Sequence, residues 1–414
     1  MEALGASRRI YELLAAASIG PAPRVRAWSG ETWGPEEAFS TLVLRHPGAF
    51  GALLLPPNDL TAGEAYVFDD VDIEGDIVAT MRFGADLVET GTMQRLRVAR
   101  LAASLPRDRR RHQTERPRFS GRVHSIRRDR AAVSHHYDTS NDFFSLFLDP
   151  KMVYSCAHFL DPSEPLETAQ RRKLDMICRK LELRPGDRFL DVGCGWGALV
   201  LHAATHYGVE ATGVTVSEEQ ADEVAKRAAE AGVTERVRVI RDDYRNISGR
   251  YEAVASVGMV EHVGLSKLPG YFRQLRSLLA PGGQVLNHGI VTRDRRPARG
   301  TSFVRTYVFP DGQLHKVEDA VAAAEDAGFE LRDLESLRQS YALTLTRWVA
   351  NLEANADAAR ALVGDRTYRI WRLYMAGSVV AFERAAIAVD QLLLSDPNRP
   401  WSFGRRRLLA TDDR

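Results

Sequence analysis

Three glycines follow an acidic residue in the segment Asp191-Val-Gly-Cys-Gly-Trp-Gly197. The apolar residues around this segment predict a short strand before the glycines, and Ala198–Tyr207 predicts a helix after them. Glycine suits the turn between the two elements, because the backbone must bend tightly and lie against a ligand where a Cβ would obstruct it. The segment therefore indicates a nucleotide-type site, although ordinary strand-to-helix turns also carry this pattern.

Two nucleoside-containing ligands compete for such a loop. A dinucleotide site has the spacing Gly-x-Gly-x-x-Gly and an acidic residue at the end of the second strand. Here the spacing is Gly-x-Gly-x-Gly, and the second strand ends in Gly213-Val-Thr-Val-Ser217 without a carboxylate. The order Asp-x-Gly-x-Gly-x-Gly is the pattern of S-adenosylmethionine (SAM) sites, where Asp191 can position the cationic methionine end. Thr215 and Gln220 would then hydrogen-bond the ribose.

Alternating elements are expected to position this loop. Predicted strands and helices alternate from residue 189 to residue 291, which is typical of a parallel, doubly wound α/β sheet. Ligands of such sheets bind at the carboxyl ends of the strands. The sequence predicts these ends at Gly193, Thr215, Asp242, Val257 and His288.

The regions outside the sheet have other patterns. Residues 69–76 resemble a calcium loop, but the spacing of their acidic residues is wrong and their alternation predicts a half-exposed strand. Beyond the sheet we expect helices over residues 316–327, 342–359 and 368–394. The last of them carries an aromatic stripe that fits core packing or a helical cap over an active site.

Length and charge bound the organisation of the chain. At 414 residues the chain exceeds the size of a single core, so two domains are expected. An abrupt run of arginines over residues 116–130 predicts a linker between an N-terminal domain, residues 1–115, and a catalytic domain with a C-terminal helical cap, residues 131–414. The linker fits a solvated connector better than a patch for anionic lipid. A net charge of +1 argues against nucleic acid as a partner.

The cysteines and the N-terminal residues indicate the cellular compartment in which the protein is expected. Cys156, Cys178 and Cys194 have no metal-type spacing, so neither a disulfide framework nor a metal site is expected, and a reducing cytoplasm fits best. The first residues lack a signal-peptide pattern, and no run reaches the ~18 apolar residues of a spanning helix. We therefore expect a protein that is soluble or touches a membrane surface.

Four motifs in order indicate a family. They are Tyr154-Ser-Cys, Asp191-Val-Gly-Cys-Gly-Trp-Gly, Thr212-Gly-Val-Thr-Val-Ser-Glu-Glu-Gln and Glu261-His-Val-Gly. Over residues 130–390 the chain resembles the cyclopropane-fatty-acyl-phospholipid synthase and mycolic acid cyclopropane synthase family, and a weaker likeness covers residues 60–75. This resemblance implies a class I SAM methyltransferase fold, a mostly parallel sheet with helical lid insertions, together with a smaller α+β N-terminal domain.

The resemblance also implies two groups of site residues. One group would contact SAM, with the last two residues flanking the adenine: Tyr154, Ser155, Asp191, Gly193, Gly195, Thr215, Gln220, Tyr244 and Val257. The other would form a pocket for bicarbonate or carbonate: Cys156, Glu261, His288, Ile290 and Tyr341. His262 is expected to be structural, and Ser340 departs from the His-Tyr pair that is frequent in the family.

The activity that the resemblance implies is transfer of the SAM methyl group to a cis double bond in unsaturated phospholipid acyl chains. A double bond is a poor nucleophile, so the electrophilic methyl must be held against it without water. A base then removes a proton and the ring closes. Ring formation is preferred, and a methylene or methyl branch made with a separate reductase is the alternative.

Two further interpretations remain open. The chain could bind SAM and lipid without catalysis, or it could methylate a small molecule on nitrogen or oxygen. The retained anion-pocket residues favour catalysis. The family resemblance implies a cytoplasmic protein that is associated peripherally with the inner face of the membrane, and a homodimer is expected, supported by the N-terminal domain.

Overall fold

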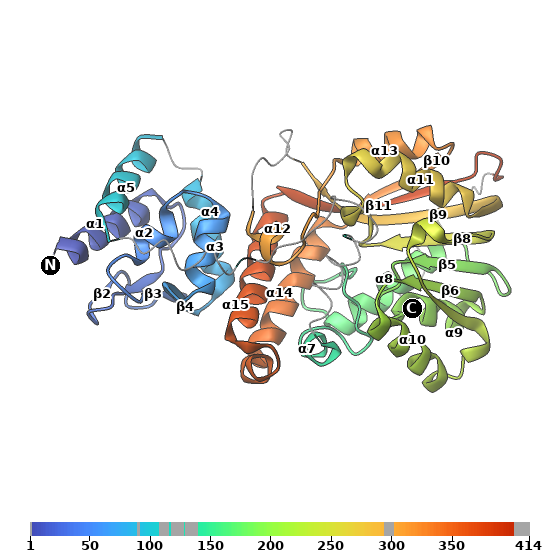
Figure 1. Ribbon diagram of the computed structural model, residues 1–414, viewed down its shortest axis with the longest axis horizontal. Helices are drawn as coiled ribbons and strands as arrows, with labels where there is room; N and C mark the ends of the chain where they lie inside the picture. The colour runs from blue at the N-terminus through green and yellow to red at the C-terminus, as the bar shows by residue number, and fades with distance from the viewer. Residues whose placement is uncertain are drawn as a thin grey trace. The chain divides into compact units, whose positions relative to one another are not determined.

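The computed structural model describes residues 2–88, 92–106, 116, 128, 140–293 and 302–400. The chain divides into two compact units (Figure 1). Unit 1 combines residues 1–118, 298–310 and 352–381, and unit 2 combines residues 119–297, 311–351 and 382–414. Apart from Arg116 and Arg128, the predicted linker lies outside the described residues. Residues 352–381, predicted as part of the cap on the catalytic domain, group with unit 1 instead.

Unit 2 is built on a seven-stranded sheet with the order β10-β11-β9-β8-β5-β6-β7. All neighbouring pairs from β9 to β7 are parallel, and β11 runs antiparallel to both β9 and β10. The predicted doubly wound, mostly parallel sheet is confirmed. Its strands are β5 (Arg188–Val192), β6 (Glu210–Thr215), β7 (Val237–Arg241), β8 (Tyr251–Val257), β9 (Leu279–Thr292), β10 (Glu330–Ser336) and β11 (Ile387–Ser395).

Helices cover both faces of this sheet (Figure 1). Successive residues of β5 point to opposite faces, so Phe189 packs in one apolar core and Leu190 in the other. The Phe189 core includes residues of α8 (Leu166–Lys180), α9 (Ala198–Tyr207) and α10 (Glu218–Glu230), and the Leu190 core includes residues of α11 (Leu268–Ser277) and α13 (Val317–Asp326). Burial on both faces of β5 fixes the position of the glycine loop that follows it.

Shorter elements complete unit 2. They are α7 (Asn141–Ser145), η2 (Thr234–Arg236), η3 (Tyr244–Asn246), η4 (Val260–His262) and η5 (Leu265–Lys267). Helix α14 (Arg338–Ala354) begins in unit 2, and the last residues of α15 (Ala356–Glu383) also belong to unit 2. Helix α15 is interrupted at Gly364, whose backbone is not helical.

The predicted helix over residues 368–394 is wrong in its second half. Helix α15 ends at Glu383, the chain turns at Ala385 with φ of +56°, and Ile387–Ser395 forms β11. A short continuous apolar run fits a buried helix and a buried strand equally well by pattern alone. Here the segment forms a strand because it hydrogen-bonds to β9 on one side and to β10 on the other. Residues 342–359 are helical as predicted except for a break at Asn355, where α14 ends and α15 begins. The helix over 316–327 and the strand within 69–76 are confirmed.

Unit 1 is an α+β arrangement around a four-stranded sheet with the order β2-β1-β3-β4. Its strands are β1 (Arg24–Arg26), β2 (Thr32–Trp33), β3 (Ser40–Leu44) and β4 (Val71–Gly75). Its helices are α1 (Glu2–Ala17), α2 (Ala49–Leu54), α3 (Asp59–Val67), α4 (Ile77–Val88), α5 (Thr92–Ser104) and α12 (Phe303–Tyr307), with most of α15.

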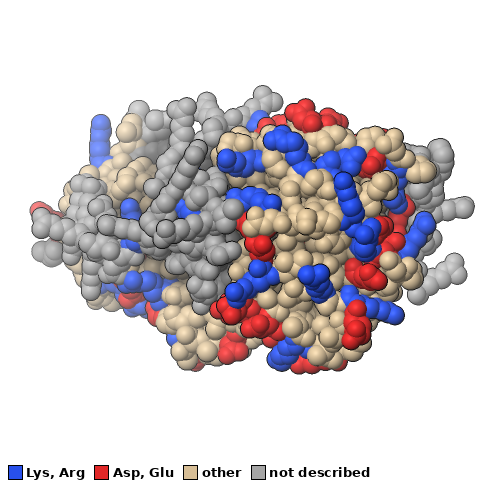
Figure 2. Space-filling view, turned by 45° about the vertical axis from the view of Figure 1, so that its right-hand side comes forward, with Lys and Arg blue, Asp and Glu red and all other residues tan. Residues whose placement is uncertain are grey.

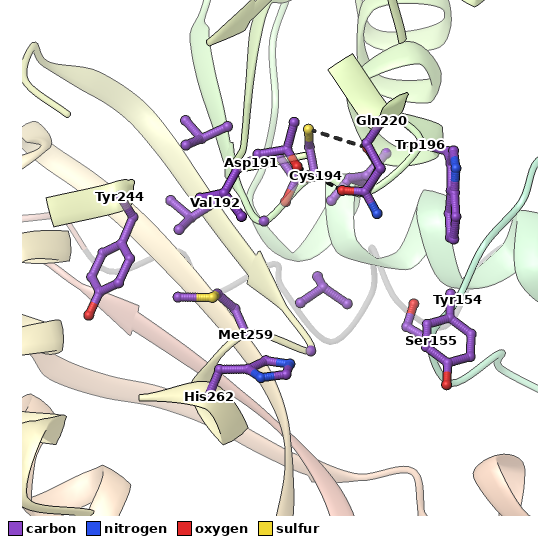
Figure 3. A pocket seen from close by; sticks show the side chains of 18 of the residues that line it. Tyr154, Ser155, Asp191, Val192, Cys194, Trp196, Gln220, Tyr244, Met259 and His262 are labelled. Atoms are coloured by element: carbon purple, nitrogen blue, oxygen red, sulfur yellow. Dashed lines mark hydrogen bonds between the residues drawn. The ribbon is translucent and has the colours of Figure 1, made fainter. Parts of the chain in front are cut away.

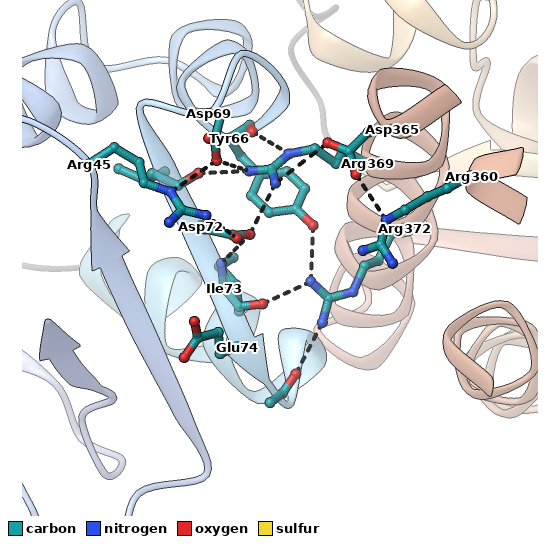
Figure 4. A network of polar contacts seen from close by, with 12 residues as sticks. Arg45, Tyr66, Asp69, Asp72, Ile73, Glu74, Arg360, Asp365, Arg369 and Arg372 are labelled. Atoms are coloured by element: carbon teal, nitrogen blue, oxygen red, sulfur yellow. Dashed lines mark hydrogen bonds and ion pairs between the residues drawn. The ribbon is translucent and has the colours of Figure 1, made fainter. Parts of the chain in front are cut away.

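Two buried arginines of α15 hold the distant chain segments of unit 1 together (Figure 4). Arg369 donates from Nε to Tyr66 O at 2.8 Å and from Nη2 to Val71 O at 2.9 Å. Arg372 donates from Nη1 to Tyr66 Oη at 2.9 Å and to Ile73 O at 3.0 Å. These bonds satisfy backbone carbonyls around β4, which explains why residues 352–381 group with the N-terminal part of the chain.

The surface carries both signs of charge. On the face shown in Figure 2, described basic and acidic side chains are interspersed and do not separate by sign, in keeping with the formal net charge of +1. Within the part of the chain that the structure describes, no helix is both long and apolar enough to cross a membrane.

Candidate active site

A cavity of about 420 Å³ lies at the carboxyl ends of β5, β6 and β8 in unit 2 (Figure 3). This volume falls within the range of ~300–1,000 Å³ that is usual for small-molecule sites. All nine residues predicted to bind the cofactor line it: Tyr154, Ser155, Asp191, Gly193, Gly195, Thr215, Gln220, Tyr244 and Val257. The sequence motifs from separate parts of the chain therefore meet at one place.

The glycine loop forms the floor between β5 and α9. Gly193, Gly195 and Gly197 have φ of +81°, +54° and +82°, a conformation that side chains with a Cβ rarely adopt. A Cβ on Gly197 would also lie 2.7 Å from Cγ2 of Val224. The amides of Gly193 and Cys194 both donate to Val214 O at 2.9 Å, which ties the loop to β6. The turn thus requires glycine for its backbone and for close packing.

Asp191 lies at the end of β5 and is 2% exposed. Its Oδ1 atom has no hydrogen-bond partner among the described residues. Burial raises the pKa of this carboxyl to about 7, against the opposing charge of Lys173. A buried acceptor without a partner is costly. Asp191 is therefore suited to a cationic group of a ligand.

Thr215 and Gln220 are held by each other at the end of β6. Thr215 Oγ1 donates to Gln220 Oε1 at 2.7 Å. Ser217 caps the following helix, because its Oγ accepts from Gln220 N at 3.2 Å. Figure 3 shows the Gln220 amide directed into the cavity, so its nitrogen can donate to a hydroxyl of a ligand.

The two ends of the cavity differ in character (Figure 3). At one end the ring of Tyr244 packs edge-on against Tyr271 at 5.7 Å. At the other end Tyr154 stacks on Trp348 at 5.2 Å, next to an edge-on contact with Phe144 at 5.5 Å. A flat aromatic group fits the first end, and the second end has an aromatic wall.

Glu261 and Ile290 of the predicted anion pocket are in direct contact. Ile290 N donates to Glu261 Oε1 at 2.7 Å, whereas Glu261 Oε2 is buried without a partner among the described residues. Burial raises the pKa of Glu261 to about 7. The carboxyl group therefore changes its protonation near neutral pH.

His288 precedes Ile290 by two residues on β9, so both side chains lie on one face of the strand. Its Nδ1 lies 3.0 Å from Nε2 of Gln391 on β11. With the Gln391 amide nitrogen as the donor, Nδ1 accepts and the ring proton is on Nε2. Burial lowers the pKa of His288 to about 3, which keeps the ring neutral. Nε2 is buried without a partner among the described residues, so the neutral ring has one nitrogen left for a ligand.

Cys156 and Tyr341 are organised by the start of α14. Cys156 Sγ donates to Ala157 O at 3.1 Å and to Leu337 O at 3.7 Å. Burial raises the pKa of the Cys156 thiol, which stays protonated. The ring of Tyr341 lies 6.1 Å from that of Trp348 in an edge-on arrangement.

Ser340, where the family frequently has histidine, supports the same loop. Its Oγ accepts from Phe159 N at 3.2 Å. Ser340 therefore anchors the segment that follows Cys156.

None of the five predicted anion-pocket residues is among the described residues that line the cavity, but three of them adjoin it. Cys156 follows Ser155, Glu261 precedes His262, and His288 pairs with Val257 across β8 and β9. Leu337 N also donates to Val389 O at 2.9 Å, and β11 continues from there to Gln391. Glu261 contacts Ile290, and His288 lies two residues before Ile290 on β9. Strand β11 pairs with β9 at His288 and, through Val389, bonds Leu337, whose carbonyl accepts from Cys156.

Sequence reasoning missed several residues that line the cavity: Lys173, Trp196, Asp242, Met259 and His262. Asp242 was predicted as a strand end, a signal that could have marked it. His262, expected to be structural, faces the cavity in Figure 3. Lys173 gave no signal, because a lysine in an amphipathic helix is usually exposed.

Comparison with known proteins places the chain. Residues 124–392 match the family model described as mycolic acid cyclopropane synthetase. A probable fatty acid methyltransferase of Pseudomonas putida is 39% identical over 92% of this chain and 94% of its own length. A probable fatty acid methyltransferase of Mycobacterium tuberculosis is 36% identical over 95% of this chain and 97% of its own length.

Solved structures agree. The cyclopropane synthase MmaA2 from Mycobacterium tuberculosis superposes with a TM-score of 0.62 at 34% identity, over 64% of this chain and 98% of that chain. The mycolic acid cyclopropane synthase CmaA1, complexed with SAH and CTAB, gives a TM-score of 0.61 at 33% identity over the same shares. The chain therefore belongs to the mycolic acid cyclopropane synthetase family and is a SAM-dependent methyltransferase.

Proposed function

We propose that the enzyme transfers the methyl group of SAM to the cis double bond of unsaturated phospholipid acyl chains and closes a cyclopropane ring. The observation that carries this proposal is a pair of buried polar atoms without partners among the described residues, Glu261 Oε2 and His288 Nε2. Burying such atoms is costly, so they indicate a polar ligand beside the SAM cavity. Relatives named as cyclopropane synthases support the choice of reaction.

The cavity residues fit SAM. Asp191 Oδ1 suits the ammonium group of the methionine end, and Gln220 suits the ribose hydroxyls. Tyr244 and Val257 are assigned to the adenine, and the remaining assigned residues are Tyr154, Ser155, Gly193, Gly195 and Thr215. When bound, SAM supplies an electrophilic methyl group.

The second site fits bicarbonate or carbonate. His288 Nε2–H donates to an anionic oxygen. Glu261 Oε2 and the anion form a hydrogen bond when a proton lies on either of them: a protonated Glu261 donates to the anion, or bicarbonate donates its O–H to the Glu261 carboxylate. Cys156, Ile290 and Tyr341 complete the assigned pocket. When bound, the anion supplies a base.

The residues around these sites have three tasks. His288 stays neutral, so it orients the anion without neutralising it. The rings of Tyr154 and Tyr341 each contact the ring of Trp348. Each aromatic ring can stabilise positive charge on the acyl chain by ~0.5–2 kcal/mol without reacting with it. The aromatic wall also excludes water. The net reaction adds one CH₂ to the acyl chain and releases one proton.

A labelling experiment tests this proposal. Purified protein is incubated with methyl-labelled SAM and vesicles of dioleoyl phosphatidylcholine, and with distearoyl phosphatidylcholine as the matched saturated control. Label is expected in the acyl chains of the unsaturated lipid only. Label in neither lipid rejects the lipid substrate, and label found only in an added amine or phenol supports a small-molecule methyltransferase.

A second candidate product is a methylene- or methyl-branched acyl chain made with a separate reductase. It is favoured by the two relatives that match this chain over nearly its full length, because both are named fatty acid methyltransferases. Mass spectrometry of the acyl products after mild hydrogenation separates the candidates. A methylene branch takes up hydrogen under conditions that leave a cyclopropane ring intact.

We also propose that the enzyme works in the cytoplasm at the inner face of the membrane, as a homodimer, with unit 1 positioning the lipid. Flotation of the purified protein with phospholipid vesicles tests membrane association, and sedimentation equilibrium tests the dimer. Protein that stays at the bottom of the gradient, or that sediments as a monomer, contradicts the respective part.

A further inference from the structure

Lys173 is a buried charge to which the proposed function gives no role. It lies on α8, is 1% exposed, and lines the cavity together with Ser155 and Asp191. Burial lowers the pKa of Lys173 to about 8, against the opposing effects of Cys156, Asp149 and Asp191. Burying an ammonium group is costly unless its charge is used. Its position at a cavity for a zwitterionic ligand indicates that use.

The hydrogen bond of Lys173 fixes the polarity of Ser155. Lys173 Nζ lies 2.7 Å from Ser155 Oγ. An ammonium group only donates, so the serine oxygen accepts and its own hydrogen must be donated elsewhere. Ser155 lines the cavity. Its hydroxyl is therefore available there as a donor, with a positive charge directly behind it, and an anionic oxygen of a ligand is the matching acceptor.

We propose that Lys173 is a positioning residue that fixes Ser155 as a hydrogen-bond donor and supplies the counter-charge for the carboxylate of the cofactor's amino-acid end. Asp191, at the end of β5, has the opposite sign and an unpartnered oxygen. Lys173 and Asp191 thus match the two charges of an amino acid. The inference rests on the proposed SAM site and adds the residue that recognises the carboxylate of the cofactor.

A purely structural role for Lys173 makes a different prediction. The loop carrying Ser155 is already anchored by a neutral residue on the same helix, because Gln170 Nε2 donates to Ser155 O at 2.9 Å and to Val153 O at 3.3 Å. Gln170 does not line the cavity. Gln170→Met therefore removes loop anchoring without removing charge, and it is the matched control for Lys173→Met.

Calorimetric titration with two ligands separates charge from anchoring. SAH carries the amino-acid end, and 5′-methylthioadenosine lacks it. Lys173→Met is expected to weaken SAH binding about 10- to 100-fold, the range for losing a hydrogen bond to a charged group, and to leave methylthioadenosine binding within about twofold of wild type. Gln170→Met is expected to weaken both ligands by similar factors. The double variant tests whether Lys173 acts through Ser155. Adding Ser155→Ala to Lys173→Met should lower the affinity for SAH much less than Ser155→Ala lowers it in wild type.

Equal losses for both ligands in Lys173→Met, or no loss for either, overturn the proposal. If wild type fails to bind SAH, the proposed cofactor site itself is rejected, which distinguishes the two failures. If Lys173→Met does not fold by circular dichroism, Lys173→Gln, which also removes the charge, is titrated with the same two ligands. A loss confined to SAH supports the proposal, and equal losses or no loss overturn it.

Discussion

At the scale of single residues, Glu261 has one oxygen bound and one without a partner. Ile290 N donates to Oε1, and Oε2 is buried. Glu261→Gln keeps the acceptor and replaces Oε2 with an amide donor, so it changes the hydrogen bonding of the anion site but hardly its shape. We expect turnover to fall at least ~100-fold. SAH affinity, measured by calorimetry, should stay close to that of wild type, because Glu261 does not line the cavity. Equal losses in both would make Glu261 a cofactor ligand.

The same substitution has a consequence for stability against pH. Burial raises the pKa of Glu261 from its ordinary 4.5 to about 7. The folded state therefore favours the protonated form, and its advantage is present below the unfolded pKa and lost as pH rises through about 7. Glutamine does not titrate. Between pH 5 and pH 8, urea unfolding should show Glu261→Gln gaining stability relative to wild type, and a constant difference would contradict the raised pKa.

Residue types and spacing were enough to predict the glycine loop, Thr215 and Gln220, because backbone and hydrogen-bond requirements there are local. The anion-pocket assignments came from the family resemblance, and their roles stay predictions. Lys173 and His262 could not be found in this way. Their position at the cavity depends on how α8 and η4 pack against the sheet, and no local pattern distinguishes them from surface residues.

At the scale of elements, the β5–α9 turn depends on glycine for two separable reasons. Gly197→Ala combines positive φ with a contact of 2.7 Å to Val224, so it should destabilise the protein by more than the ~1–3 kcal/mol of backbone strain alone. Gly186 has φ of +87° with open space around an added Cβ, so Gly186→Ala is the strain-only control. Urea unfolding of both variants checks this. Equal losses would mean that the Val224 contact has no energetic weight.

Gly195→Ala completes this comparison. Gly195 lines the cavity with φ of +54°, and an added Cβ there meets no protein atom within 4 Å. If SAM binds as proposed, the added Cβ would enter the space that the ligand occupies. SAH affinity should therefore fall in Gly195→Ala while stability falls no more than in Gly186→Ala, and unchanged SAH affinity would place the ligand elsewhere.

Strand β11 shows where prediction of elements fails. Its apolar run continues an aromatic helix in sequence, and its identity as a strand depends on β9 and β10, which are distant along the chain. This strand also supplies Gln391, whose side chain hydrogen-bonds the His288 ring. The misassigned element therefore contributes to the candidate site, whereas the helix predicted over residues 316–327 was confirmed as α13.

At the scale of the whole molecule, the Arg369 and Arg372 contacts join residues 352–381 to the N-terminal part of unit 1 (Figure 4). Arg372→Met would leave Glu353 and the carbonyls of Ile73 and Gly75 without their donor. Removing one partner from a buried charged network costs ~3–5 kcal/mol, so we expect a loss of that size in urea unfolding.

The control for this variant is Arg360→Met, on the same helix. Arg360 pairs with Asp365, and their side chains are 42% and 57% exposed, respectively. The loss in the free energy of unfolding should therefore stay below ~1 kcal/mol. Similar losses in the two variants would contradict the role of the buried network. Because Tyr66, Val71 and Ile73 belong to the N-terminal segment, deletion of residues 1–115 also removes these partners and is expected to destabilise α15. Composition predicted the Arg-rich boundary, but not these pairings between distant segments.

The most direct test of the central claim follows the hydrogen atoms of the transferred methyl group. SAM with a fully deuterated methyl group is incubated with the enzyme and dioleoyl phosphatidylcholine vesicles, and the acyl products are analysed by mass spectrometry. If Glu261 and His288 hold a base that acts on the transferred carbon, the product is a cyclopropane chain that retains two of the three deuterium atoms. An acyl product that retains all three, or no deuterium in the acyl chains at all, would contradict the account.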